Sequence, residues 1–74
     1  MKITRHGLEK NVGKQVFLYR ASAELEGILR KDGSGYYLEA CTDSARSDIQ
    51  LEDGDGLGLV RESDRSLLIY DVEL

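Results

Sequence analysis

The chain has 74 residues with ten basic and fourteen acidic side chains, which gives a net charge of −4 at pH 7. A chain of this length forms one domain and buries only about 60% of the surface that its unfolded form exposes, so we expect self-association to add stability. One cysteine and one histidine exclude an intrachain disulfide and make a zinc site unexpected. No apolar run approaches the roughly 20 residues that span a membrane, and the first residues lack the apolar core of a signal peptide. We therefore expect a cytoplasmic protein without a metal or other cofactor.

The charge is distributed unevenly along the chain. Residues 1–20 carry five basic side chains and one acidic one, whereas residues 21–74 carry five basic and thirteen acidic ones. Because nonspecific nucleic-acid binding depends on neutralising phosphates, the acidic part argues against a broad nucleic-acid surface. A local basic face near the N-terminus stays open as a binding surface, and ordinary solubilising charge is the simpler interpretation.

The first element that the sequence predicts is a short helix over residues 4–11. Thr4 is a favourable N-cap residue, and Ile3 before it can pack on Leu8. Leu8 and Val12 are four residues apart and therefore lie on one helix face.

After Lys14 the hydrophobic pattern changes from a helical period to that of strands. Residues 16–19 are all strand formers, and Leu25, Gly27 and Leu29 alternate with charged residues, as in a half-buried antiparallel strand. The mid-strand glycine indicates a bend or a close backbone approach. Short strands with brief connections favour a small barrel. The predicted strands are 15–20, 23–31, 35–42, 56–61 and 66–73.

The connections are predicted from their polar residues and glycines. Residues 31–35, KDGSG, indicate a tight hairpin turn between the second and third strands. Residues 42–48 are polar and indicate a loop, and residues 49–51 are a short continuation of the sheet. In EDGDG, Asp53 and Asp55 have the spacing of a calcium loop, but the pattern lacks the required further ligands, so a glycine-rich hairpin turn is predicted instead.

Residues 12–39, VGKQVFLYRASAELEGILRKDGSGYYLE, resemble the first motif of the Sm and Sm-like proteins. The matching features are a Gly-Lys start, alternating apolar residues, a glycine-centred second strand and the end of the third strand, at Gly13, Lys14, Val16, Leu18, Leu25, Gly27, Leu29, Leu38 and Glu39. Residues 60–61 and 67–69 are similar to the second motif, with Glu62 where the family has a glycine. The resemblance implies a mainly β, single domain over 1–74: a small five-stranded antiparallel SH3-like or Sm-like barrel with a short N-terminal helix.

The resemblance also implies candidate RNA-binding residues. In RNA-binding members of the family, the turn after the second strand holds an Asp and, four residues on, an Asn that hydrogen-bonds the edge of a base. Asp32 matches the first position, but Tyr36 occupies the second. Tyr36 and Tyr37 can stack on bases, although strand alternation places one of the two in the core. Arg61 matches a family arginine that contacts RNA, while an ion pair with a neighbouring acid is its simpler role.

A second implication of the resemblance is self-assembly. In the family, the fourth strand of one subunit pairs with the fifth strand of the next, and a ring closes. Residues 56–61 and 66–73 would supply these two edges, and an apolar strand edge left unpaired favours aggregation. We expect a cyclic homo-oligomer of five to seven copies. The candidate interface residues are Leu57, Leu59, Leu67, Leu68, Ile69 and Tyr70.

The sequence contains no arrangement that meets the geometric requirements of catalysis, so we do not expect an enzyme. Two functions stay open. The first is a ring-forming Sm-like protein that is associated with RNA through a non-standard site. The second is an SH3-like assembly or protein-interaction module that binds another protein or its own copies and no RNA; fold alone does not decide between them.

Overall fold

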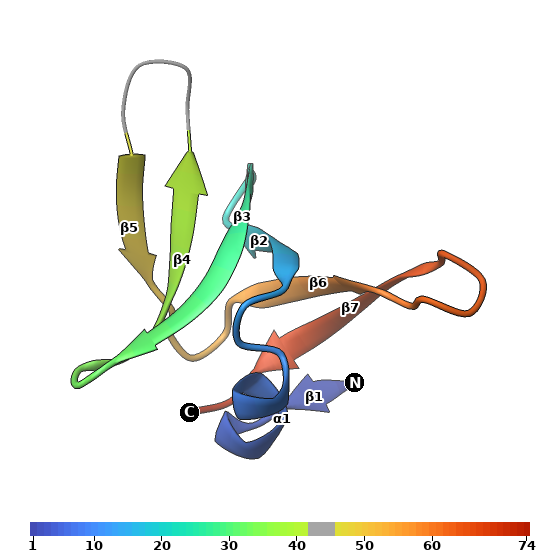
Figure 1. The fold of residues 1–74 in the computed structure, drawn as a ribbon, viewed down its shortest axis with the longest axis horizontal. Helices are drawn as coiled ribbons and strands as arrows, with labels where there is room; N and C mark the ends of the chain where they lie inside the picture. The colour runs from blue at the N-terminus through green and yellow to red at the C-terminus, as the bar shows by residue number, and fades with distance from the viewer. Residues whose placement is uncertain (42–45) are drawn as a thin grey trace.

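The computed structural model describes residues 1–41 and 46–74, which form one short helix and seven strands (Figure 1). The mainly β architecture with an N-terminal helix that the sequence predicts is confirmed. The strands form one sheet in the order β1-β7-β6-β2-β3-β4-β5. All neighbours in the sheet are antiparallel except β1 and β7. The bounds are β1 Lys2–Ile3, α1 Arg5–Lys10, β2 Gln15–Arg20, β3 Ala23–Asp32, β4 Gly35–Cys41, β5 Arg46–Gln50, β6 Gly56–Val60 and β7 Leu67–Val72.

The prediction of a closed five-stranded barrel is wrong in two respects. The sheet has two additional strands, β1 and β5, and its two edges are not paired with each other, so it is not closed. The two-residue β1 is too short to show alternation in the sequence. β5 lies at an edge, and its half-buried Ile49 is surrounded by the exposed Ser47, Asp48 and Gln50. Residues 46–48 were therefore predicted as part of a loop, and residues 49–51 as a short continuation of the sheet. Part of the predicted loop, residues 42–45, lies outside the described residues.

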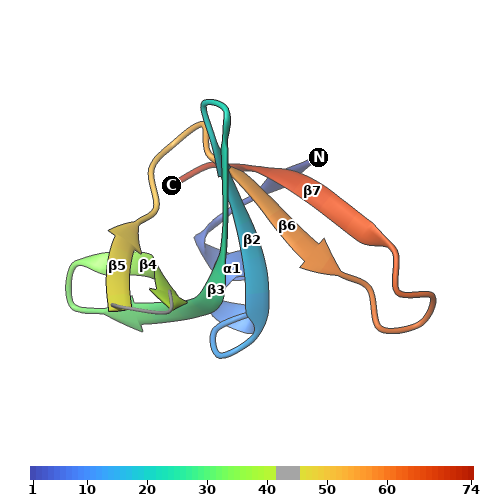
Figure 2. The same cartoon turned by 90° about the horizontal axis from the view of Figure 1, so that it is seen from above.

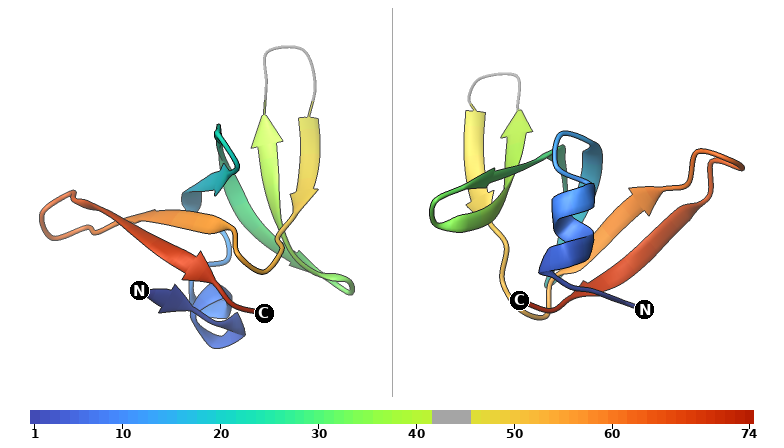
Figure 3. Two further views of the ribbon diagram at one scale, coloured as in Figure 1. Left: turned by 180° about the vertical axis from the view of Figure 1, so that it is seen from behind. Right: turned by 60° about the horizontal axis from the view of Figure 1, so that its bottom comes forward.

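The hairpin of β6 and β7 explains why the sheet stays open. β6 pairs with β2 on one side and with β7 on the other, and β1 then adds beyond β7. Figures 2 and 3 show this hairpin extending away from the strands β3, β4 and β5 rather than folding back on them. The strands that would have to meet to close a barrel therefore point in different directions.

The core lies on one face of the sheet and is covered by α1. Its fully buried side chains come from the helix and from four strands: Leu8, Val16, Leu18, Leu29, Leu38 and Leu57. Val16 and Leu18 occupy alternate positions along β2, and the buried Tyr36, Leu38 and Ala40 do so along β4, as expected for strands with one buried face. The helix reaches only Lys10, so Val12 lies beyond it and is exposed, contrary to the predicted helix face.

A close approach between β3 and β4 occurs at Gly27, as the sequence predicts. A Cβ atom at Gly27 would lie 2.4 Å from the carbonyl oxygen of Glu39 on β4. β3 is long and curved (Figure 1), and it pairs with β2 through its first half and with β4 through its second.

Among the described residues, no helix combines the length and the apolar character that crossing a bilayer requires.

Candidate functional site

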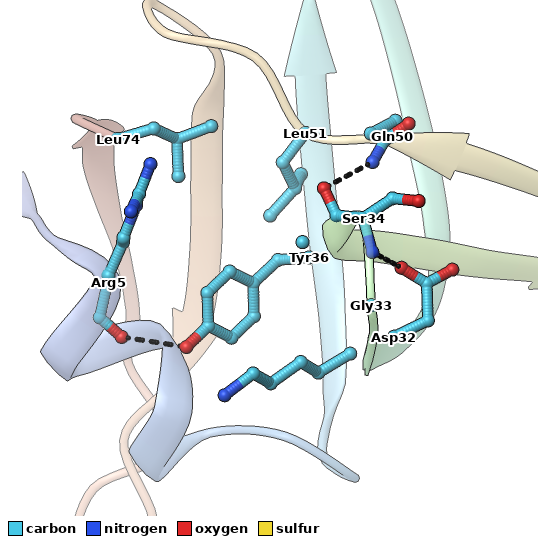
Figure 4. A pocket seen from close by; sticks show the side chains of 10 residues that line it. Arg5, Asp32, Gly33, Ser34, Tyr36, Gln50, Leu51 and Leu74 are labelled. Carbon is cyan, nitrogen blue, oxygen red and sulfur yellow. Dashed lines mark hydrogen bonds between the residues drawn. The ribbon is translucent and has the colours of Figure 1, made fainter.

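A cavity of about 350 Å³ opens beside the turn that joins β3 and β4. The turn itself, the N-terminal end of α1 and the end of β5 form its walls (Figure 4). In this view Arg5 and Leu74 lie on one side, Gln50 and Ser34 lie on the other, and Tyr36 lies between them. Residues that are far apart in the sequence therefore meet around one hollow, and the cavity is our candidate site.

The turn is a tight hairpin, as predicted, and its polar groups fix its shape. Asp32 pairs with Gly35 at the end of the ladder, and Gly35 has a positive φ of 125° that favours glycine. The Ser34 N–H donates to Oδ1 of Asp32 over 2.8 Å, an Asx turn. Gln50 Nε2 donates to the Ser34 carbonyl oxygen over 3.0 Å. One Asp32 oxygen is thus used to hold the turn, and Gln50 ties the turn to β5.

Tyr36 forms the inner wall of the cavity. Its side chain is only 7% exposed, and its hydroxyl donates to a carboxylate oxygen of Glu9 over 2.8 Å and lies 3.2 Å from the Arg5 carbonyl oxygen. Lys31 Nζ lies 5.5 Å from the ring centroid and also contacts Glu9, at 2.9 Å. Of the two adjacent tyrosines, Tyr36 is therefore the core residue, and Lys31 covers one of its ring faces.

These contacts set the charges at the base of the cavity. The hydrogen bonds from Lys31 and Tyr36 hold the pKa of Glu9 below its usual value. The same bond to Glu9 raises the pKa of Lys31 and that of the Tyr36 hydroxyl. At neutral pH the carboxylate is charged, the ammonium is charged and the phenol is neutral. The three groups connect α1 to the β3–β4 hairpin.

Two residues outside the four named RNA-binding candidates complete the cavity, and one of them, Arg5, belongs to the basic N-terminal face that the sequence left open as a binding surface. Arg5 is exposed, and among the described residues its guanidinium has no hydrogen bond or ion pair, so it is available to a ligand. The carbonyl oxygen of the Gln50 side chain is likewise not used in the bond to Ser34. An amide is the group that the turn lacks in its own sequence, and Gln50 supplies one from β5. Residues 49–51 were predicted as a short continuation of the sheet, but no local signal pointed to a role for Gln50.

The structure brings together only two of the four predicted RNA-binding residues. Asp32 and Tyr36 line the cavity, whereas Tyr37 is half-buried on the opposite face of β4. Arg61 follows β6 at the far hairpin, where its guanidinium lies 3.9 Å from Asp64. It lines a separate groove beside β6 and β7.

The predicted interface strands pair with each other inside one chain. β6 and β7 form an antiparallel ladder from Gly56↔Asp71 to Val60↔Leu67. Leu57 is fully buried and has no surface to offer a second copy. Three of the remaining predicted residues, Leu59, Leu68 and Tyr70, are half-buried. The other two, Leu67 and Ile69, are exposed.

The EDGDG segment is a turn, but the predicted hairpin is wrong because β5 and β6 are not neighbours in the sheet. Asp55 is buried, and its carboxylate accepts two hydrogen bonds from the Arg20 guanidinium, at 2.9 and 2.7 Å. It also accepts one from the Glu52 N–H at 2.9 Å. The hydrogen bonds from Arg20 lower the pKa of Asp55. Among the described residues, no group of side chains that could hold a metal ion occurs. The acidic turn therefore fastens the β5–β6 connection to β2.

Comparison with family models, with curated proteins and with solved structures finds no match to this chain. The chemistry of the cavity is the remaining guide to function. It combines a free guanidinium, an amide at its rim and backbone groups of a fixed turn. Such a set suits a planar, polar ligand with a negative charge nearby.

Proposed function

We propose that this chain is an Sm-like, RNA-associated protein that binds a base of single-stranded RNA in the cavity beside the β3–β4 turn. The observation that carries the proposal is the meeting of the Gln50 amide and the free Arg5 guanidinium at one cavity. RNA-binding proteins read unpaired bases with such groups, through hydrogen bonds to the base edge and stacking on aromatic rings or guanidinium planes.

Each group has a distinct part in the proposed complex. The side-chain oxygen of Gln50 accepts a hydrogen bond from the base edge, a role that the resemblance assigns to an Asn of the turn. Arg5 stacks on the base or contacts the adjoining phosphate, since its planar guanidinium can do either. Tyr36 is a wall that limits the size of the ligand, because its hydroxyl and one ring face are already occupied.

The charge of the molecule limits the expected affinity. Among the described residues that line the cavity, Arg5 is the one unpaired cation, because Lys31 is paired with Glu9. A protein that neutralises few phosphates binds weakly and shows a shallow dependence on salt. We expect micromolar binding of a short oligonucleotide at low salt, with most of the specificity coming from the base.

Titration of labelled oligo(U) and oligo(A) at low and moderate salt tests the proposal. Arg5→Ala and Gln50→Ala are expected to weaken binding about tenfold or more, the effect of losing one good base or phosphate contact. Arg61→Ala is the matched control, since it removes an exposed arginine at the far hairpin and should leave binding within about twofold. Absence of binding at low salt, or an equal loss in Arg61→Ala, contradicts the proposal.

A second candidate function is an assembly module that binds no RNA. Leu67 and Ile69 favour it, because they are 44% and 51% exposed on one strand and such a strand tends to pair with another chain. The ring of five to seven copies stays a prediction. The pairing that we expected between β6 of one copy and β7 of the next cannot form, because β6 is already paired with β2 and β7 within one chain. Self-association of the RNA-free protein, together with a negative titration, would favour this function.

A further inference from the structure

The outer edge of β7 is open along most of its length. β1 pairs with β7 only at Asp71 and Val72. In the part of the chain that the structure describes, no strand runs beside residues 67–70 on that side. Residues 67–70 therefore form a strand edge that another strand can bind.

Hydrogen bonds at the end of β7 show which groups face the open edge. The N–H groups of Asp71 and Glu73 donate to β1, at 2.7 and 2.9 Å, whereas the N–H of Val72 donates toward the start of β6, at 2.8 Å. Because the direction alternates along an antiparallel strand, the N–H and C=O groups of Leu67 and Ile69 point to the open edge.

The side chains at this edge are apolar and uncharged. Leu67 and Ile69 share the exposed face of the hairpin, and Val60, which is 48% exposed, lies directly opposite Leu67 on β6. Residues 66–70 contain no charged side chain. A surface of this kind is suited to a second copy of the chain, which contributes the same apolar edge of its own β7.

We propose that two copies of this chain pair antiparallel through the β7 edge, about a two-fold axis at Leu68. In a continuous antiparallel sheet, opposite residues point to the same face, so a two-fold axis must pass through a residue of the strand. An axis at Leu68 places Leu67 opposite the partner's Ile69. Each of these two pairs exchanges N–H···O bonds through groups that are free in the single chain.

Neighbouring registers do not satisfy the same conditions. An axis at Ile69 would place Leu67 opposite Asp71, whose N–H already donates to β1. An axis at Leu67 would require Arg65 in the ladder, but Arg65 has a positive φ of 59° and lies outside the strand. Only the axis at Leu68 uses the free groups on both chains.

Charges at the two ends of the contact also agree with this register. It brings Arg65, which lies outside the ladder, toward the end of the partner's β7, where Asp71 is paired with Lys2 of β1, and the same approach occurs at the other end. Among the described residues, neither the Arg65 nor the Asp71 side chain has an ion pair within one chain. The positive φ of Arg65 turns the chain out of the strand where the partner's β1 begins. The register therefore brings opposite charges near each other at both ends of the contact.

The dimer is independent of the RNA-binding cavity and would give the assembly candidate a defined contact. The cavity lies at the β3–β4 turn, and β7 lies beyond β6 on the other side of β2. Failure of the dimer therefore leaves the RNA titration unaffected, and failure of RNA binding leaves the dimer unaffected.

Disulfide trapping tests the register. In the proposed dimer Leu68 faces the partner's Leu68 as a non-hydrogen-bonded pair, whose Cα atoms lie about 4.5 Å apart, within the range of a disulfide. In a Cys41→Ser background, Leu68→Cys should form a covalent dimer within minutes of mild oxidation. Leu67→Cys and Ile69→Cys, each alone, are the matched controls and should form at least tenfold less. Equal trapping at all three positions overturns the register.

Sedimentation of the chain without introduced cysteines tests the dimer itself. At tens of micromolar the wild type should have twice the monomer mass. Ile69→Lys, which places a charge in the contact, should be monomeric, while Val12→Lys, at an exposed site near the helix, should behave as wild type. A monomer at every concentration, a larger ring, or a dimer that Ile69→Lys leaves intact overturns the proposal.

Discussion

Asp55 shows at the residue scale how a side chain in a turn can hold a sheet together. Its carboxylate is almost fully buried and accepts three hydrogen bonds, two of them from Arg20 on β2. Arg20 also donates to the main-chain carbonyl oxygen of Gln50, at 2.8 Å. A single ion pair thus fixes the end of β5, the following turn and β2. A buried charge is tolerated when it is paired and hydrogen-bonded in this way.

Asp55→Asn tests this role and its pH dependence. Because Arg20 lowers the pKa of Asp55 in the folded state, the unfolded chain binds a proton more readily, and stability rises with pH in this window. The contribution is complete above the ordinary pKa near 4 and disappears as the pH falls through the folded pKa. We expect Asp55→Asn to lower the free energy of unfolding by about 2 kcal/mol at pH 7. Urea unfolding at pH 7 and pH 3 should show a smaller difference at pH 3.

The matched control for that experiment is Glu62→Gln, which changes the same charge at an exposed site after β6. It should leave the free energy of unfolding within about 0.5 kcal/mol of the wild type at pH 7. A pH profile of Asp55→Asn that runs parallel to the wild type would contradict the assignment of the ion pair.

Gly27→Ala tests the close approach of β3 and β4. The added Cβ would lie 2.4 Å from a backbone oxygen of Glu39, so the strands must separate. We expect a loss of about 1–3 kcal/mol in the free energy of unfolding, the usual range for overpacking. Gly33→Ala is the control, because its Cβ would meet no atom within 4 Å. Urea denaturation of both variants measures the difference, and equal stability would contradict the close approach.

At the scale of elements, α1 is held to the sheet by polar contacts as well as by Leu8. The helix has only six residues, and its N-cap residue Thr4 makes no side-chain cap bond. A helix of this length is marginal by itself. Glu9 therefore supports the helix by joining Tyr36 on β4 and Lys31 on β3. Formation of α1 is coupled to the β3–β4 hairpin that forms the cavity.

Tyr36→Phe tests this coupling, because it removes only the hydroxyl group. The variant should lower the midpoint of urea unfolding by on the order of 0.5 M. Amide hydrogen exchange should increase more in α1 than in β2, since the bond fastens the helix. Tyr37→Phe, on the opposite face of the same strand, is the control. Uniform changes in exchange across both elements would contradict a specific link to α1.

The sequence predicts elements reliably where a repeated pattern is present. β2 was predicted with its observed bounds, because its residues are strand formers and Val16 and Leu18 alternate toward the core. β1 was missed, and β5 was predicted only at its end, residues 49–50, because a strand of two residues and an edge strand with one apolar residue, Ile49, carry almost no pattern. EDGDG was predicted as a hairpin because its residues favour a turn. Whether the two strands that a turn connects also pair with each other depends on long-range contacts, and β5 and β6 do not pair.

At the scale of the whole molecule, the candidate site also contains residues that a local pattern indicates and residues that only long-range folding brings in. Asp32 and Tyr36 could be predicted because they belong to one turn and its flanking strand. Arg5 and Gln50 meet them only through folding, as α1 and β5 lie on either side of the β3–β4 hairpin (Figure 4). The turn itself contains no Asn or Gln, as its sequence shows, and only the structure places the Gln50 amide of β5 beside it.

Hydrogen exchange measured at two protein concentrations connects the architecture of one chain with the proposed dimer. In the single chain the amides of Leu68 and Tyr70 face β6 and should exchange slowly, whereas those of Leu67 and Ile69 face the open edge and should exchange fast. At high concentration the dimer should slow exchange at Leu67 and Ile69 at least tenfold, with little change at the two even positions. This alternation distinguishes strand pairing from nonspecific apolar contact, which would slow all four amides together. Fast exchange at both odd positions in the concentrated sample would show that the edge of β7 remains unpaired.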